Sequence, residues 1–484
     1  MRLLFVALLA ASLIPAAASQ NRPQAKSSYD VEEPAPPVHT YSPELMTELT
    51  SVRDAALNDD YAYRVVAHLS DNIGPRPAGS PQAQAAVEYV ADQLRQLGLD
   101  VKLEPVKVPF WFRGAESAEL VAYPGQAPGT TQKIVLTALG GNTPTPAAGL
   151  TADVLVVRNY DELKALGRQK VEGKVVLFNV LFDKQKAAAG YWGDAYGEAV
   201  DYRGKGPLAA AGLGAVACLV RSVGGAEFRS PHTGYSHPAG IPAGAVTAED
   251  ADLIAHLAAQ GPVRIHFVLL SENRPEVQSY NVVGDLKGSE HPEQVVLVSG
   301  HLDSWDLGTG AIDDAAGVAV AMQTAATLQK LHLRPRRTIR VIAWMDEEDG
   351  GQGHDAYAVA HQPDIPNHVA AIESDLGADH PLGFLVKAPA AALPWLAPVQ
   401  TVLASFGANL LKEVDFSPGA DITPLSKLGV PTLGILQDGR TYFNYHHTPA
   451  DTLDKIDPRQ LRENAAAMAV MAHALASMDQ PLPR

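Results

Sequence analysis

Short apolar runs separated by helical stretches dominate the C-terminal part of the chain. Four runs of four to seven mostly apolar residues have the length and β-branched content of buried strands, and they lie at 294–299, 338–344, 369–372 and 430–436. Helical spacing of apolar residues follows at 314–331 and 460–478. Apolar strands that alternate with helices are typical of a mixed, largely parallel sheet with helices on its faces. We therefore predict an α/β fold for residues 273–484.

The preceding residues contain two different patterns. Residues 81–97 have apolar side chains at helical spacing and stop at Gly98, and residues 99–110 alternate like a strand. From about residue 113, glycine and proline become frequent, and short β-rich runs alternate with turns. We predict that 44–112 belongs with 273–484 and that 113–272 is an inserted β-rich domain.

The N-terminus has the pattern of an exported protein. Arg2 precedes an apolar run that ends in small residues, so residues 1–19 are predicted to be a signal peptide. The run is shorter than the roughly 20 residues that span a membrane, which argues against a membrane anchor. Residues 20–43 are polar and rich in proline, as in a linker or pro-segment. We expect a periplasmic or secreted protein.

Composition narrows the function classes further. The 484 residues are 46% hydrophobic and carry a formal charge of −16, which excludes a disordered chain and disfavours nucleic acid as a partner. Cys218 is the only cysteine, so no intrachain disulfide forms, and its apolar surroundings predict a buried, unreactive thiol. His232 and His237 have no acidic residues near them in the sequence and are interpreted as loop histidines.

Acidic residues and histidines gather where the predicted strands end. Five such segments follow a strand or open the next helix, at 300–304, 310–314, 346–350, 373–375 and 445–452. In open α/β sheets the binding crevice lies at the carboxyl ends of the strands. Each segment alone is weak support for a site. A lone HxD is more often a hydrogen-bonded pair, an acidic cluster is usually a solvated turn, and an aspartate at a helix start is usually an N-cap. Together they predict one site at one edge of the sheet.

The charges of this site require compensation. Asp313, Glu347, Glu348 and Asp375 in one crevice would repel one another and raise each other's pKa values. Two divalent cations would remove this repulsion. Mixed imidazole and carboxylate ligands suit Zn²⁺, although Co²⁺ or Mn²⁺ would also be accepted. The alternative is an acidic pocket that binds a cationic ligand without metal.

The motifs together resemble a known family. The run VVLVSGHLDSWDLGTGAIDDAAG, the EE-x-G after a strand, the ESD and the HHTPADT are similar to those of the di-zinc exopeptidases, a family that includes bacterial leucyl aminopeptidases and glutamate carboxypeptidases. GPRPAGS at 74–80 resembles an early loop of that family, and the resemblance covers about 44–480. It implies a three-layer zinc-exopeptidase sandwich with an insert like the protease-associated domain, and it is strongest to the carboxypeptidase Q type.

The resemblance implies a role for each candidate metal ligand. His301 and Asp375 would hold one zinc, Glu348 and His447 the other, and Asp313 would bridge the two. The family pattern H-(S/T)-x-x-D-T selects the second histidine of the pair 446–447.

Further roles follow from the same resemblance. Glu347 would be the general base, and Asp303 would be a carboxylate that orients His301. Asp346 precedes the glutamate pair and leaves Asp346/Glu347 as a rival register, but Gly350 fits the EE-x-G pattern with Glu347/Glu348. Asp421 is either a residue that lines the substrate site or a structural aspartate.

The implied function is hydrolysis of dipeptides or terminal peptide bonds by water that two metals activate and a glutamate deprotonates. Aminopeptidase, carboxypeptidase and dipeptidase specificities all stay open, as does a homodimer. Two alternatives belong to other classes: a non-catalytic, receptor-like relative, and a single-zinc acyltransferase similar to glutaminyl cyclases. A serine hydrolase is disfavoured because the sequence has no GxSxG motif.

Overall fold

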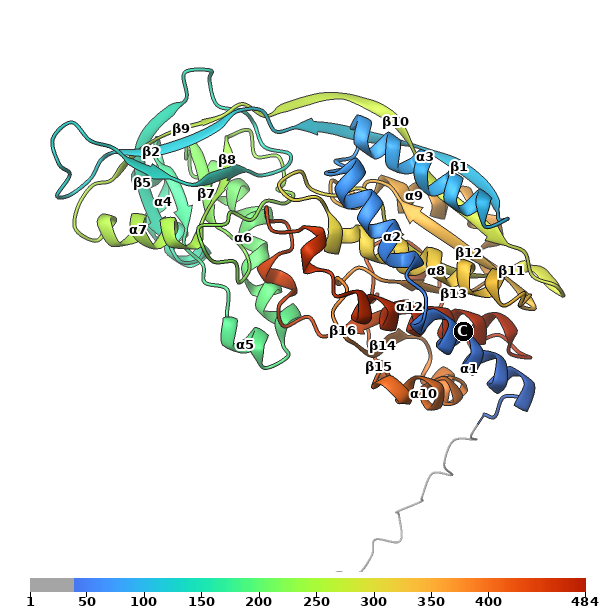
Figure 1. The fold of residues 1–484 in the computed structure, drawn as a ribbon. Helices are drawn as coiled ribbons and strands as arrows, with labels where there is room; N and C mark the ends of the chain where they lie inside the picture. The colour runs from blue at the N-terminus through green and yellow to red at the C-terminus, as the bar shows by residue number, and fades with distance from the viewer. Residues whose placement is uncertain (1–38) are drawn as a thin grey trace, which may run out of the picture. The chain divides into compact units, whose positions relative to one another are not determined.

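A computed structural model describes residues 39–484, which contain two eight-stranded sheets (Figure 1). The first sheet has the order β1-β10-β12-β11-β13-β16-β14-β15. Its strands, in that order, are Asp100–Phe112, Glu272–Leu286, Arg337–Trp344, His291–His301, His368–Glu373, Thr432–Gln437, Pro381–Lys387 and Leu410–Glu413.

The centre of this sheet is parallel. β11 pairs in parallel with β12 and β13, and β13 pairs in parallel with β16. β1 pairs antiparallel with β10, β10 with β12, and β14 with β16, whereas β14 and β15 are parallel. Because β11, β12, β13 and β16 run in the same direction, the four segments that follow them emerge at the same edge. The predicted α/β fold with a mixed sheet is confirmed.

Helices cover both faces of the first sheet. A large hydrophobic cluster packs one face against six helices: α1 (Pro43–Leu57), α2 (Tyr61–Ala67), α3 (Pro81–Gln96), α8 (Ala316–Lys330), α10 (Ala397–Leu403) and α12 (Pro458–Ser477). A second cluster, which includes Trp344, Tyr357 and Leu425, packs the other face against α9 (Gln352–Ala360) and α11 (Thr423–Lys427). The first sheet is therefore the middle of three layers.

The second sheet is built from residues 116–269 in the order β3-β2-β9-β5-β6-β7-β8-β4. Its strands, in that order, are Gln132–Ile134, Glu116–Ala122, Arg264–Leu269, Leu150–Val157, Val175–Phe178, Ala217–Arg221, Ala243–Val246 and Leu136–Ala138. Its helices are α4 (Tyr160–Val171), α5 (Lys184–Ala188), α6 (Trp192–Gly212) and α7 (Ala248–Ala258). The expected β-rich texture is thus incomplete, since these four helices lie among its strands. The assignment of 113–272 to a separate domain stays a prediction.

Short 3₁₀ and π segments complete the described structure: η1 (His68–Ile73), η2 (Ala311–Ala315), η3 (Gln362–Asn367), η4 (Ala390–Leu396), η5 (Ala404–Phe406), η6 (Tyr442–Asn444) and η7 (Leu453–Lys455). Among residues 39–484, none of the helices combines the length and hydropathy that a membrane span requires. The predicted signal peptide and most of the predicted linker fall on residues 1–38, outside the described residues.

Several local predictions are confirmed. α3 is capped by Ser80, whose side chain accepts a hydrogen bond from the amide of Ala83, and it ends just before Gly98, whose φ is +82°. Cys218 is fully buried within β7. Burial raises the pKa of its thiol, in agreement with an unreactive side chain.

Candidate metal centre

The predicted site residues meet at the carboxyl edge of the parallel strands. His301 is the last residue of β11, Glu347 and Glu348 follow β12, and Asp375 follows β13. His447 comes from the loop after β16. Asp313 lies in η2, which opens α8, so the segments that the sequence places after strands converge as predicted.

One group of three side chains surrounds His301. Its Nε2 atom lies 3.0 Å from Oδ1 of Asp313 and 3.3 Å from Oδ1 of Asp375. His301 and Asp313 are almost completely buried, at 1% and 3% exposed. One cation at this point would face one imidazole nitrogen and two carboxylates.

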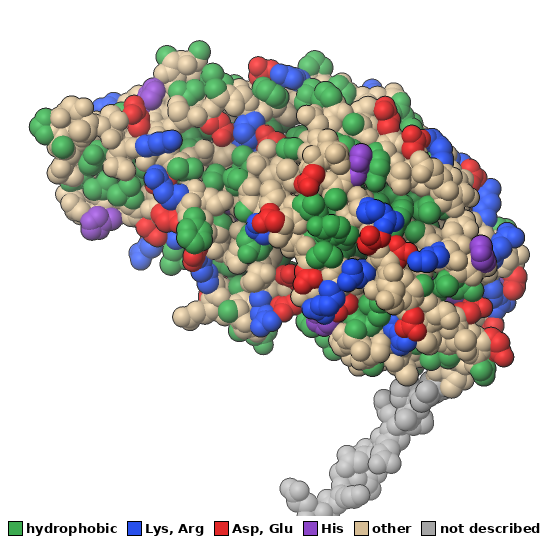
Figure 2. Space-filling model, viewed as in Figure 1, with side chains coloured by type: hydrophobic (Ala, Val, Ile, Leu, Met, Phe, Trp, Pro, Cys, Tyr) green, Lys and Arg blue, Asp and Glu red, His purple; other side chains and the backbone are tan. Residues whose placement is uncertain are grey.

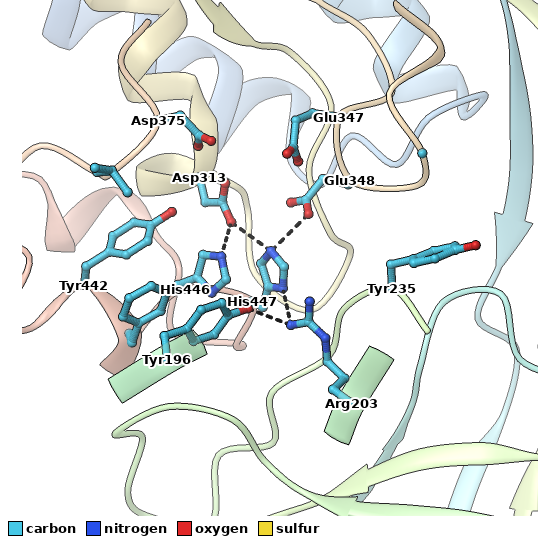
Figure 3. Close-up of a pocket in the computed structure, with 13 residues that line it drawn as sticks. Tyr196, Arg203, Tyr235, Asp313, Glu347, Glu348, Asp375, Tyr442, His446 and His447 are labelled. Carbon is cyan, nitrogen blue, oxygen red and sulfur yellow. Dashed lines mark hydrogen bonds and ion pairs between the residues drawn. The ribbon is translucent and has the colours of Figure 1, made fainter. Parts of the chain in front are cut away.

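A second group surrounds His447. Its Nε2 atom lies 3.1 Å from Oδ2 of Asp313 and 3.0 Å from Oε2 of Glu348 (Figure 3). His446 is more distant, with Nε2 3.4 Å from Oδ2 of Asp313. Asp313 therefore belongs to both groups and directs one carboxylate oxygen to each of them.

Backbone carbonyls orient both histidines. Nδ1 of His301 donates to the carbonyl of Asp303 at 3.0 Å, and Nδ1 of His447 donates to the carbonyl of Thr233 at 3.3 Å. In each ring the proton on Nδ1 leaves the Nε2 lone pair free, which is the state that a metal ligand needs.

The contact with Asp303 corrects one expectation. Its carboxylate lies 3.9 Å from Nδ1 of His301, too far for a hydrogen bond. It accepts instead from the amides of Asp346, Glu347 and Glu348, at 2.7–3.2 Å. The carboxylate of Asp303 is thus occupied by the three amides of this turn, and the backbone carbonyl of Asp303 orients the imidazole of His301. Asp303 thus connects His301 with the turn that carries the glutamates.

Two further carboxylates fix the segment before α8. Asp451 accepts from the amides of Ala311 and Ile312, both at 2.8 Å. Asp314 accepts from the amides of His301 and Gly317 at 3.1 and 2.9 Å. These hydrogen bonds fix the residues directly before and directly after Asp313 and so position its side chain.

Arg76, from the GPRPAGS motif, holds the early loop of the chain against the site. Its side chain is fully buried and donates to five backbone carbonyls at 2.8–3.2 Å, those of Leu69, Gly74, Leu302, Thr309 and Gly310. It therefore ties residues 69–74 to the loop between His301 and Asp313.

Burial and neighbouring charges dominate the electrostatics of the site. Burial by itself raises the pKa of Asp313, but His446, His301 and His447 outweigh it and hold that pKa well below its usual range. Burial raises the pKa of Glu347 well above its usual range, with the charge of Asp375 contributing in the same direction. The visible surface does not have this concentration of acidic residues: on the face shown in Figure 2, Lys and Arg side chains are interspersed with Asp and Glu.

The site residues suit a cation. Oδ2 of Asp313 and Oε1 of Glu348 are buried and accept no hydrogen bond from any residue in 39–484. Buried carboxylate oxygens without partners are costly, and a cation between them and the two Nε2 atoms would compensate this cost. The donors are two imidazole nitrogens and three carboxylates, a set that zinc accepts.

All of these residues except His301 line a cavity of about 370 Å³. Glu347 and Glu348 line it, whereas Asp346 does not: Asp346 is fully buried, and its Oδ2 accepts from the amide of Gln352. Burial and the nearby Asp303 raise the pKa of Asp346 to about 9. Asp421 does not line the cavity either. It is buried and paired with Nδ1 of His354 at 2.9 Å, which favours the structural role over the substrate-lining one.

Six cavity residues were not predicted from the sequence: Tyr196, Arg203, Tyr235, Leu376, Tyr442 and Phe443. The first three come from residues 116–269 and carry no local motif that marks them. His232, interpreted as a loop histidine, is indeed in a loop but is fully buried, with Nε2 3.2 Å from Nδ1 of His446. His232, His446 and His447 form a third group of possible ligands, but the guanidinium of Arg203 lies 3.3 Å from Nδ1 of His447 and disfavours a cation there.

Comparisons with known proteins agree with this geometry. Residues 281–472 match the model of peptidase family M28. The chain is 35% identical to carboxypeptidase Q of Xenopus laevis over 456 residues, which cover 91% of this chain and 93% of that protein. The chain belongs to peptidase family M28. This membership confirms the predicted metallopeptidase of the zinc exopeptidase family.

Two solved structures share the fold. A peptidase M28 precursor from Shewanella amazonensis SB2B superposes with a TM-score of 0.85 at 36% identity, covering 91% of this chain and 99% of that one. The zinc aminopeptidase BSAP of Bacillus subtilis shares the fold, with a TM-score of 0.62 at 20% identity, covering 87% of this chain and 95% of that one.

Proposed function

We propose that this M28 peptidase is a di-zinc exopeptidase that hydrolyses dipeptides or terminal peptide bonds. The observation that carries the proposal is the position of Asp313. Its two carboxylate oxygens face two different histidines, and each histidine is joined by a further acid, Asp375 or Glu348. One shared carboxylate between two groups of three is the arrangement that a pair of metal ions needs.

We assign His301 and Asp375 to one zinc, His447 and Glu348 to the other, and Asp313 to both. When bound, the two zincs would polarise the scissile carbonyl and lower the pKa of water. Glu347 lines the cavity beside Glu348 without belonging to either group, so its carboxylate is free to take a proton from water and pass it to the leaving amine. The rival register with Asp346 as base is disfavoured because Asp346 does not line the cavity.

Exopeptidase action is supported by the relatives. Carboxypeptidase Q and an aminopeptidase of Bacillus subtilis, YwaD, are both among the similar proteins. A receptor-like relative without activity is disfavoured, since all five proposed ligands are present and directed at one another. A single-zinc acyltransferase is disfavoured because Asp313 is shared between two groups. Export rests on the pattern of residues 1–19, and a homodimer stays a prediction that sedimentation velocity would test.

The first experiment measures zinc content and hydrolysis of Ala-Ala in the purified protein. We expect about two zincs per chain, loss of hydrolysis on chelation and its recovery when Zn²⁺ is returned. One zinc per chain with full activity would overturn the di-zinc proposal. Absence of both metal and hydrolysis, with Zn²⁺ supplied, would overturn the enzyme itself.

A further inference from the structure

His446 and His447 are adjacent in the sequence and direct their imidazoles at the same carboxylate oxygen (Figure 3). Nε2 of His446 lies 3.4 Å from Oδ2 of Asp313, and Nε2 of His447 lies 3.1 Å from it. The two rings are stacked, with centroids 3.6 Å apart and planes inclined by 15°, and both are buried, at 8% and 7% exposed. Distance and burial therefore distinguish the two histidines only weakly as zinc ligands.

The two rings differ in what holds their other nitrogen, Nδ1. Nδ1 of His447 lies 3.3 Å from the carbonyl of Thr233, which can only accept, so this nitrogen carries the proton. Nδ1 of His446 lies 3.2 Å from Nε2 of His232, which is another imidazole nitrogen, and either of these two atoms can be the donor. The direction of this one hydrogen bond decides what His446 presents to the metal site.

The surroundings of His232 set that direction. Its ring is fully buried, its Nδ1 has no hydrogen-bond partner within residues 39–484, and it forms no ion pair with these residues. A buried imidazole without an acidic partner is neutral and carries one N–H, because burial disfavours the charged form. A proton on Nδ1 would be a buried donor without an acceptor, which is rarer in proteins than an unused acceptor. The proton is therefore on Nε2, and His232 donates to His446.

His446 then presents a hydrogen-bond donor to the metal site. A neutral ring that accepts at Nδ1 carries its proton on Nε2, and this is the atom directed at Oδ2 of Asp313. An N–H attracts a carboxylate oxygen, whereas a lone pair at the same position would repel it. A protonated nitrogen has no lone pair for a metal, so this ring is excluded from the zinc ligands. His447, with its proton on Nδ1, keeps the lone pair on Nε2.

The two residues that assign these roles are neighbours in one loop beside the second sheet. The amide of His232 donates to Oγ of Ser222 at 3.0 Å, and that hydroxyl donates to the carbonyl of Val246, the last residue of β8, at 2.8 Å. The amide of Thr233 donates to the carbonyl of His447 at 2.9 Å. These bonds fix the backbone at both residues and so hold the ring of His232 in place.

We propose that His232 is a positioning residue that fixes His446 as a hydrogen-bond donor to Asp313, so that only His447 of the adjacent pair binds zinc. This inference rests on the proposed di-zinc peptidase and adds a hydrogen-bonded chain of three residues to it. A carboxylate that binds metal and accepts such a bond is held in its orientation. Without His232, the proton of His446 is free to move to Nδ1, and the ring competes with His447 for the metal.

NMR that correlates ring protons with ring nitrogens over several bonds reads the proton positions directly. The sample is the zinc-loaded protein with nitrogen-15-labelled histidine. For His446 we expect a protonated Nε2 and an unprotonated Nδ1, and for His447 the reverse, with Nε2 bound to metal. The spectra of His446→Gln and His447→Gln assign the two rings. An unprotonated or metal-bound Nε2 in His446 would overturn the proposal.

Glutamine substitutions separate a donor from a ligand, because the side-chain amide of glutamine supplies an N–H near the position of Nε2 in histidine. His446→Gln should keep its zinc affinity within about threefold of the wild type, whereas His446→Leu should bind zinc about 10- to 100-fold more weakly. His447→Gln should retain fewer than two zincs per chain. Competition with a chelating dye measures the affinity. If His446→Gln loses zinc as His447→Gln does, His446 is a ligand and the proposal is wrong.

Variants of His232 test its control over His446. His232→Leu removes the donor and should move the proton of His446 to Nδ1 and weaken zinc binding about 10-fold or more. His232→Gln keeps an N–H at the same place and should restore both properties. His256→Leu, on the exposed surface of α7, is the matched control and should change neither. A His446 ring that keeps its proton on Nε2 in His232→Leu would refute the role of His232.

The outcomes separate this inference from the proposed function. Should His232→Leu fail to fold, the wild-type spectrum and the variants of His446 still decide. A protein that binds two zincs and hydrolyses Ala-Ala, but has an unprotonated Nε2 in His446, refutes the role of His232 alone. A protein with neither zinc nor hydrolysis refutes the peptidase proposal.

Discussion

Thr233 and His447 are joined by two hydrogen bonds although 214 residues separate them in the sequence. The amide of Thr233 donates to the carbonyl of His447 at 2.9 Å, and the carbonyl of Thr233 accepts from Nδ1 of the imidazole. A loop beside the second sheet thus orients a proposed zinc ligand that follows the first sheet. Partners of this kind commonly change metal affinity when they are disturbed.

Gly234 offers a way to move this loop. Its φ is +140°, and a Cβ there would lie 2.4 Å from Cζ of Arg203. We expect Gly234→Ala to displace both Arg203 and the Thr233 carbonyl, weaken zinc binding about 10- to 100-fold and lower kcat/KM at least 10-fold. Zinc competition with a chelating dye measures the affinity. Gly240→Ala is the matched control, since Gly240 also has a positive φ (+70°) but no neighbour within 4 Å.

Glu347→Gln separates proton transfer from metal binding. The amide keeps the shape of the side chain but cannot accept the proton, so kcat should fall about 100-fold or more while zinc content is unchanged. Asp346→Asn tests the other register and should keep kcat within about threefold, because Asp346 does not line the cavity. The assignment is wrong if Asp346→Asn loses more activity than Glu347→Gln.

Asp313→Asn should release metal from both groups at once. The substitution removes a charge that each group shares, and we expect elemental analysis to find fewer than one zinc per chain. Asp355→Asn, on the exposed surface of α9, should keep the wild-type content. Two retained zincs in Asp313→Asn would mean that this residue does not bridge.

Arg76→Lys should destabilise the fold. A lysine ammonium has three donors where the guanidinium reaches five carbonyls, so buried carbonyl oxygens lose their partners and the free energy of unfolding falls by about 3 kcal/mol. Urea denaturation measures the loss. Arg95→Lys on α3, where the arginine is 50% exposed, should cost less than about 0.5 kcal/mol. A similar cost for both would show that the Arg76 contacts contribute little.

His368 should make stability fall in mild acid. It is buried, accepts from the hydroxyl of Tyr357 at 2.8 Å and donates to the carbonyl of Asp364, and burial lowers its pKa from 6.5 to about 4. Between these values the unfolded chain takes up a proton that the folded one refuses, so up to about 3 kcal/mol of stability is lost as pH falls from about 6.5 to 4.

The measurement for His368 is urea denaturation at pH 7 and pH 4.5. His368→Gln, which cannot titrate, should lose about 2 kcal/mol less stability between the two values than the wild type does. Other groups lose or gain protons equally in both proteins and cancel in the difference. Parallel losses in the two proteins would contradict the prediction.

Much of the first sheet could be predicted because its central strands are buried on both faces. Such strands appear in the sequence as continuous apolar runs, and the proposed ligands follow them within a few residues, as His301 and Asp375 do. The register of β11 against β12 and β13 then places these ligands together without any further information.

The rest of the site depends on contacts that no local pattern encodes. Arg203 sits in the glycine- and alanine-containing helix α6, and Thr233 and His232 sit in a loop, so nothing in their neighbourhood marks them as partners of His447. Asp303 precedes the turn that it binds by more than forty residues. Its carboxylate and its carbonyl compete for partners, and only the folded geometry decides which of them reaches His301.

β1 and β10 pair antiparallel along nearly their whole lengths, and Phe112 lies opposite Glu272 at the far end. The chain therefore leaves the first sheet at Phe112, forms the second sheet, and returns to the first sheet at Glu272, next to the point where it left. The five proposed zinc ligands all lie outside this excursion, whereas Tyr196, Arg203 and Tyr235 lie within it. A change confined to residues 113–271 can therefore reshape one wall of the cavity without altering the strand order of the first sheet or the proposed zinc ligands.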